Sequence, residues 1–204
     1  MASATEFDIE EADAVEVVTP FDVDWEIYCR LRDEPANDRV RMSYLDGTLT
    51  LRSPEYVHDR GAERIGLLLR GVTPGLGLEI QGIRTTTLRK GKARRKGAGK
   101  EPDNAFYIGA NERRMRRKKS LDLAIDPPPD LAIEVDHKAD SSRALWFGRL
   151  AGDRYETVAR SVVLSRLTPA LVVEALAEAE CLGESDWKPW LRAWALTLPE
   201  PAPD

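Results

Sequence analysis

The sequence predicts an α/β protein. Short segments in which apolar and polar residues alternate are interspersed with longer segments in which apolar residues recur every three or four positions. The first pattern is typical of half-buried strands and the second of amphipathic helices. A chain of 204 residues, 42% hydrophobic and 32% charged, has the composition of an ordinary folded protein and is long enough to bury one sizeable core.

The first predicted elements are a helix, a hairpin and a second helix. Residues 1–18 are acidic and aperiodic, and we expect a disordered arm there. Asp22 is a candidate N-cap for a helix that ends near Pro35. The dipeptide Asp46-Gly47 stands between two alternating segments, which is a strong signal for a β-hairpin. Ser53-Pro54 predicts the start of a helix, and an apolar stripe follows over residues 62–72.

Further along the chain, strands precede helices. We expect a strand over residues 78–88, then a flexible, solvated loop over residues 90–100, because this stretch is basic and glycine-rich. Two strands carry Asp103 and Glu134, and a short hairpin pairs residues 154–158 with 162–164. Helices over about 169–179 and 186–196 complete a single domain spanning residues 19–196, and residues 197–204 form a disordered tail. Three tryptophans of the last helix, Trp187, Trp190 and Trp194, share one face, which favours a packing role.

Several classes of protein are excluded by composition. Cys29 and Cys181 are far apart and outside any C-x-x-C spacing, so neither a disulfide framework nor a zinc site is predicted. No apolar run approaches 18 residues, and the N-terminus lacks a basic region followed by an apolar one. We therefore expect a cytoplasmic protein with no membrane partner.

The charge is segregated along the chain. The net charge is −5, but residues 89–119 contain thirteen Lys and Arg against three Asp and Glu, which leaves −15 for the remainder. Such a basic stretch is usually a solvated loop, yet it also suits phosphate contacts. The candidate contacts to nucleic acid are Arg94, Arg95, Lys96, Lys100, Arg113, Arg114, Arg116 and Arg117.

Two acidic residues, Asp103 and Glu134, stand at one end of short apolar segments. If the two strands are neighbours, they present both carboxylates together. Paired carboxylate oxygens suit Mg²⁺, which is usually held by one or two carboxylates together with waters and substrate phosphate. A carboxylate within an apolar segment such as residues 131–135 is also expected to be buried, and a buried charge needs a partner or a metal.

Four blocks of the sequence, in order, resemble the restriction-endonuclease-like Uma2 family, which has the PD-(D/E)xK nuclease arrangement. They are Tyr44-Leu45-Asp46-Gly47-Thr48-Leu49, Ser53-Pro54 followed by His58, Glu101-Pro102-Asp103, and Pro129-Asp130-Leu131-Ala132-Ile133-Glu134-Val135. The resemblance covers roughly residues 20–142. It implies a restriction-endonuclease-like mixed sheet flanked by helices, with further helices at the C-terminus.

The resemblance also implies a chemistry, namely Mg²⁺-dependent hydrolysis of DNA phosphodiester bonds, with Mn²⁺ as an alternative ion. Asp103 and Glu134 match the metal-binding acids of the family, and His58 matches a position near the site. The bound ion would supply the nucleophile and neutralise charge that develops on the phosphate.

This chain departs from the family pattern in two ways. Asp136 stands where the family usually has a lysine, so that Asp136 becomes an auxiliary acid and Lys138 or Lys100 would have to provide the cation. After Ser141-Ser142 a helix and a strand of the pattern are missing, which would expose a sheet edge.

Other interpretations remain open at this point. Asp103 could be a turn residue, His58 a surface residue of its helix, and His137 a neighbour of the acids in sequence alone. The alternative to an active endonuclease is a catalytically inactive nucleic-acid-binding protein, or an interaction protein that uses the exposed edge and the tryptophan face. A homodimer is compatible with either function.

Overall fold

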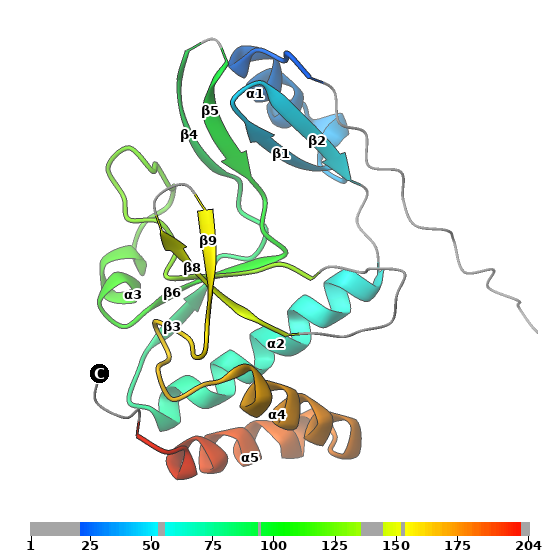
Figure 1. The fold of residues 1–204 in the computed structure, drawn as a ribbon. Coiled ribbons are helices and arrows are strands. Elements are labelled where there is room, and N and C mark those ends of the chain that lie inside the picture. Colours follow the sequence, from blue (N-terminus) through cyan, green and yellow to red (C-terminus); the bar gives the residue numbers. More distant parts are fainter. Residues whose placement is uncertain (1–20, 53–55, 94, 136–144, 152–153, 201–204) are drawn as a thin grey trace, which may run out of the picture. The chain divides into compact units, whose positions relative to one another are not determined.

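The computed structural model describes residues 21–52, 56–93, 95–135, 145–151 and 154–200 (Figure 1). These residues divide between two compact units. The first unit lies within Met1–Glu55 and Arg89–Glu101, and the second lies within Tyr56–Leu88 and Pro102–Asp204. Both contain helices and strands, and the predicted α/β class is confirmed.

The first unit is a four-stranded sheet with one long helix. Its strands are β1 (Arg41–Leu45), β2 (Thr48–Arg52), β4 (Leu88–Ala93) and β5 (Lys96–Lys100), in the spatial order β2-β1-β5-β4 (Figure 1). Helix α1 (Trp25–Asp33) is followed by the 3₁₀ helix η1 (Pro35–Asn37). The core of this unit is made by Tyr28, Met42, Tyr44 and Leu49, all 2% exposed or less.

The predicted β1–β2 hairpin is confirmed. Arg41 faces Arg52 and Leu45 faces Thr48 across the antiparallel pair. Asp46 and Gly47, the two loop residues, have φ angles of 42° and 95°. Positive φ at both positions matches the right-handed twist of the strands, and it explains the choice of Asp followed by Gly.

Helix α1 begins later than the sequence predicts. The expected N-cap, Asp22, lies outside the helix, and Asp24 stands at the N-cap without a side-chain capping bond. The carboxylate of Asp22 is instead 3.0 Å from a guanidinium nitrogen of Arg95. Asp22 therefore forms an ion pair with a residue distant in sequence instead of the helix cap that the local sequence predicts.

The expectation of a flexible loop over residues 90–100 is wrong, because β4 and β5 occupy most of it. The glycines that suggest flexibility are contact residues. A Cβ atom on Gly91 or Gly97 would lie 2.4 or 2.6 Å from the ring of Trp25, and one on Gly99 would lie 2.2 Å from the Tyr28 hydroxyl. Glycine is therefore needed where aromatic side chains of α1 pack directly on the strand backbone.

The second unit is built around a three-stranded antiparallel sheet in the order β3-β6-β7. The strands are β3 (Ile80–Gly82), β6 (Asn104–Ile108) and β7 (Leu131–Ile133), and a separate hairpin is formed by β8 (Phe147–Ala151) and β9 (Arg154–Val158). The helices are α2 (Tyr56–Gly75), α3 (Ala110–Met115), α4 (Pro169–Cys181) and α5 (Glu184–Thr197). All five residues of β6 are buried, so this strand is the centre of the unit.

Helices α2, α4 and α5 contact one another (Figure 1). Gly71 and Gly75 of α2 allow a close approach, since a Cβ atom on either would lie 2.7 Å from Leu191 or Ala195 of α5. Trp187 is 2% exposed and donates its ring N–H to the carbonyl oxygen of Ala175 at 3.1 Å. The rings of Trp190 and Trp194 stack 5.5 Å apart and pack against the same core. The predicted packing role of the tryptophans is confirmed.

The hairpin prediction near the C-terminal helices is half right. Residues 154–158 form β9, but β9 pairs with residues 147–151 rather than with 162–164. The apolar run 162–164 leads instead into the core, where Leu164 and Leu167 are 1% exposed. Val162, at the start of this run, is 62% exposed.

Two simpler expectations concern the thiols and the membrane. Cys29 and Cys181 are both free. In the part of the chain that the structure describes, none of the helices combines the length and the apolar character needed to cross a bilayer.

We expect Gly99→Ala to destabilise the protein by about 1–3 kcal/mol, because the added methyl group overlaps Tyr28 in a closely packed core. Gly183→Ala is the matched control, since its Cβ atom meets nothing within 4 Å. Urea unfolding of the two variants measures the difference. Equal midpoints would show that α1 does not pack tightly on β5.

Candidate functional site

The two predicted metal-binding acids lie at the same end of one antiparallel strand pair. Asn104 of β6 faces Ile133 of β7, and the same register continued by one residue sets Asp103 opposite Glu134. Residues opposite each other in such a pair project to the same face, with Cβ atoms about 4.5–5.5 Å apart. The fold therefore brings together the two carboxylates that lie 31 positions apart in sequence.

The face on which they lie follows from the alternation along β6. Asn104 and Phe106 pack against Gly66 of α2. Side chains alternate along a strand, so Asp103 belongs to the face away from α2. On β7, Ile133 is buried while Glu134 is exposed, which agrees with this assignment.

Asp103 is buried, with 8% of its surface exposed, and its Oδ2 atom accepts the backbone N–H of Val135 at 2.7 Å. This bond links the start of β6 to the chain just after β7. It fixes both the carboxylate and the segment that carries Glu134. Sequence reasoning missed this contact because a backbone donor leaves no signal in the identity of residue 135.

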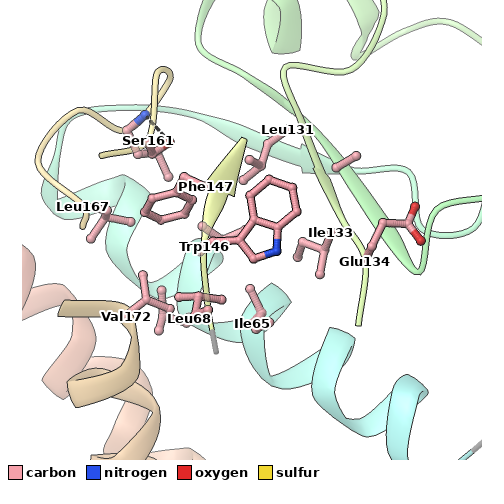
Figure 2. Close-up of a pocket in the computed structure, with 14 residues that line it drawn as sticks. Ile65, Leu68, Leu131, Ile133, Glu134, Trp146, Phe147, Ser161, Leu167 and Val172 are labelled. Carbon is pink, nitrogen blue, oxygen red and sulfur yellow. Dashed lines mark hydrogen bonds between the residues drawn. The ribbon is translucent and has the colours of Figure 1, made fainter. Parts of the chain in front are cut away.

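The expectation that Glu134 is buried is wrong. Strand β7 is only three residues long and lies at the edge of the described sheet, so the chain leaves the sheet at Glu134. The side chain stands at the rim of a cavity of about 100 Å³, and its carboxylate points away from the apolar lining (Figure 2). The Glu134 carboxylate is thus on the surface rather than enclosed in the core.

The cavity itself is apolar. Ile65 and Leu68 of α2, Leu131 and Ile133 of β7, and Phe147 line it, and Trp146 extends across it while remaining 57% exposed (Figure 2). The hydroxyl of Ser161 accepts the Leu164 N–H at 3.1 Å. Such a lining suits apolar groups and offers little to a phosphate, and Glu134 is the one acidic residue among the described residues that line the cavity.

The remaining predicted catalytic residues are less well defined. His58 is the third residue of α2. Asp136 and Lys138 lie outside the described residues, as does His137. Among the residues that are described, no cluster of three or more His, Cys, Asp or Glu side chains has the arrangement of a metal site. The described part of the candidate site is thus a pair of acids.

The predicted DNA contacts of the second unit lie on or just after α3, a short helix absent from the sequence prediction. Arg116 donates two hydrogen bonds to Glu112, four residues earlier, at 2.7 and 2.8 Å. Arg114 donates to the carbonyl oxygen of Ile125 at 3.1 Å. The side chains of Arg113 and Arg117 are exposed. The Glu112–Arg116 spacing of four is a helix signal that the sequence does carry.

The predicted DNA contacts of the first unit differ in their surroundings. Arg95 lies 3.0 Å from a carboxylate oxygen of Asp22 and 3.6 Å from one of Asp24. Lys96 and Lys100 are exposed on β5, and Arg94 lies outside the described residues. Arg95 is thus partly neutralised within its own unit.

Comparison with known proteins identifies the family. Residues 25–145 match the model of the Uma2 family, whose description is putative restriction endonuclease. This match spans more than half of the 204 residues, and the chain belongs to the Uma2 family. Searches of curated proteins and of solved structures gave no match. The resemblance seen in the four sequence blocks is confirmed.

We expect Asp103→Asn to be more stable than Asp103→Ala by about 0.5–1.5 kcal/mol. Asparagine retains an oxygen that can accept the Val135 N–H, whereas alanine leaves that donor without its acceptor. Urea unfolding gives the stabilities, and amide exchange at Val135 reports the bond directly. Identical exchange rates in the two variants would contradict this role of Asp103.

A pH-dependent contribution is expected from Glu112. Hydrogen bonds from Arg116 hold the pKa of the Glu112 carboxyl below its ordinary value. The ionised form is therefore stabilised in the folded state. This stabilisation is complete at neutral pH and is lost as the pH falls below about 4.3 and through the lowered pKa. Unfolding at pH 7 and pH 3 should show a smaller acid-induced loss in Glu112→Gln than in the wild type. Parallel losses would sink this assignment.

Proposed function

We propose that the protein is a Mg²⁺-dependent endonuclease that hydrolyses DNA phosphodiester bonds. Two findings support this proposal: membership of the Uma2 family, and the facing positions of Asp103 and Glu134 at one end of the β6–β7 pair. The second finding carries the argument, because one or two neighbouring carboxylates are the usual protein ligands of a Mg²⁺ ion that acts on phosphate. A reducing cytoplasm is the proposed location, in keeping with the free thiols.

The two acids fit a single Mg²⁺ ion. Mg²⁺ is usually held by one or two carboxylates, with water and substrate phosphate completing its shell. An ionised carboxylate has about four acceptor positions, so the bond from Val135 to Asp103 is compatible with a metal ligand. Asp103 and Glu134 would hold the ion, and Mn²⁺ prefers similar oxygen ligands. Once bound, the ion would activate a water molecule and offset charge on the phosphate.

The protein groups around this pair have separate tasks in the proposal. The Val135 N–H keeps the Asp103 carboxylate in position before the substrate arrives. Glu134 is exposed at the strand end, where a polymer can approach it. Asp136 would act as an auxiliary acid, Lys138 would supply the cation that the family usually has at position 136, and His58 would contact the phosphate.

Positive side chains would bind the DNA backbone. In the second unit we assign this role to Arg113, Arg114, Arg116 and Arg117, and in the first unit to Arg94, Arg95, Lys96 and Lys100. Lysine and arginine contacts to phosphate position a protein on DNA without reading its sequence. Arg113 and Arg117, both exposed, are the best candidates on the second unit.

Cleavage of supercoiled plasmid tests the proposal. We expect nicking with Mg²⁺ or Mn²⁺, none with a chelator, and a loss of about 100-fold or more in Asp103→Asn and Glu134→Gln, since both keep the shape and remove a charge from the metal site. Glu174→Gln, an exposed acid on α4, is the control and should cleave normally. Cleavage that persists in both site variants would remove these residues from the mechanism.

The alternative function is a nucleic-acid-binding protein without catalysis. Asp136 in place of the family lysine favours it, because a third negative charge cannot take over the task of a cation. Tight, salt-sensitive binding of DNA with no nicking under either ion would select this function over the first.

A further inference from the structure

The sheet of the first unit has two chemically different faces. Its inner face is apolar and is covered by α1, with Met42, Tyr44 and Leu49 pointing toward Trp25 and Tyr28. Since side chains alternate along a strand, the neighbours of these residues in sequence point the other way. We call the set of outward positions on β1, β2, β4 and β5 the outer sheet face.

The glycines of β4 and β5 show which side of these strands faces α1. Gly91, Gly97 and Gly99 lie against Trp25 and Tyr28, so they belong to the inner face. Arg89 is two residues before Gly91 and forms an ion pair with Asp33 of α1, which places it on the inner side too. The alternate positions, Lys90, Lys96, Ala98 and Lys100, are all exposed.

The outer sheet face is rich in cations and hydroxyl groups. It carries Arg41, Arg52, Lys90, Lys96 and Lys100, with Ser43 and Thr50 between them, and none of the outward positions on these four strands is acidic. Ser43 pairs with Thr50 on one side and with Lys100 on the other, so hydroxyls and cations are adjacent. These side chains are the ones that contact DNA phosphates.

The acids of this unit are gathered elsewhere. Glu101, 8% exposed, accepts hydrogen bonds from Arg32 of α1 at 3.2 Å and from the Met42 N–H at 3.0 Å. Asp33 is paired with Arg89, and Asp22 with Arg95. Among the described residues, these acids lie at the α1 side or at the hairpin end, and none of them forms an ion pair with the outward lysines Lys90 and Lys96.

We propose that the outer sheet face binds the sugar-phosphate backbone of duplex DNA. The proposal rests on the proposed endonuclease function and adds a substrate-binding surface in the first unit, whereas Asp103 and Glu134 belong to the second. Four strands about 4.8 Å apart give a face about 14 Å wide. A duplex carries one phosphate charge about every 1.7 Å along its axis, so a face of this size meets several phosphates.

The occupant follows from the side chains that this face does and does not have. Binding of single-stranded nucleic acid relies on aromatic rings that stack on bases. Trp25, Tyr28 and Tyr44 all lie on the inner side, where their rings contact one another instead. A membrane surface needs apolar groups that insert, and Leu45, 65% exposed, is the one large apolar side chain so exposed among the described outward positions. A charged face without aromatics suits the backbone of a duplex.

Fluorescence anisotropy with a labelled duplex of mixed sequence, in chelator so that no cleavage occurs, tests the proposal on the full chain. Lys90→Glu/Lys96→Glu should weaken binding by about tenfold or more and lower the slope of log K against log salt by about 2, since each phosphate contact contributes about 0.9. The control, Arg30→Glu/Arg192→Glu, changes two exposed helical cations and the same net charge. It should weaken binding by about threefold or less.

Each outcome bears on the proposal separately from catalysis. A duplex bound more tightly than the matching single strand or anionic vesicles supports the proposal, provided that the lysine variant keeps the wild-type melting temperature. Equal losses in the two double variants would overturn it, as would preferential binding of single strands or vesicles. If plasmid cleavage fails while duplex binding still depends on Lys90 and Lys96, the endonuclease function falls and the outer sheet face stands. If plasmid cleavage succeeds and the lysine variant binds the duplex as the wild type does, the endonuclease function stands and the role of the outer sheet face falls.

Discussion

Strand β6 is buried along its whole length, and its backbone pairing on both sides fixes the geometry of the second unit. Phe106 and Ile108 of this strand belong to the apolar core. Asp103 directly precedes β6, at the end of the strand pair where β7 ends. The bond from Val135 to Asp103 closes that end. Both acids directly adjoin this strand pair, and the bond from Val135 ties Asp103 to the segment that carries Glu134.

The first unit depends on a different constraint, the close packing of α1 on strands that carry glycine. Direct contact of Trp25 and Tyr28 with the backbone leaves no room for side chains on that face. In the β4–β5 hairpin, Arg89 pairs with Asp33 and Arg95 with Asp22, whereas Lys90, Lys96 and Lys100 are exposed. Residues 90–100 have a composition typical of a solvated loop, yet they form two strands with exposed lysines on one side.

The two units divide the proposed activity. In the proposal, the second would supply a pair of metal-binding acids and the first a face for the DNA backbone, so that hydrolysis and substrate affinity would depend on different residues. Such a division gives salt-dependent affinity from exposed lysines and metal dependence from carboxylates, two properties that respond to separate variants. The net charge of −5 is compatible with DNA binding because the positive residues are concentrated in two stretches rather than spread through the chain.

The sequence by itself determined what local chemistry dictates. It gave the Asp46-Gly47 hairpin, the helices that became α2, α4 and α5, the packing role of Trp187, and the acids that the family motif marks, because turn residues and apolar periodicity act over a few neighbouring positions. Tertiary structure decided the rest. Only the fold shows that glycines at 91, 97 and 99 meet aromatic rings, that Asp22 pairs with Arg95 instead of capping α1, and that a short edge strand leaves Glu134 exposed. These features depend on residues that are distant in sequence. Their contacts contribute more free energy than the local conformational preferences from which a sequence is interpreted.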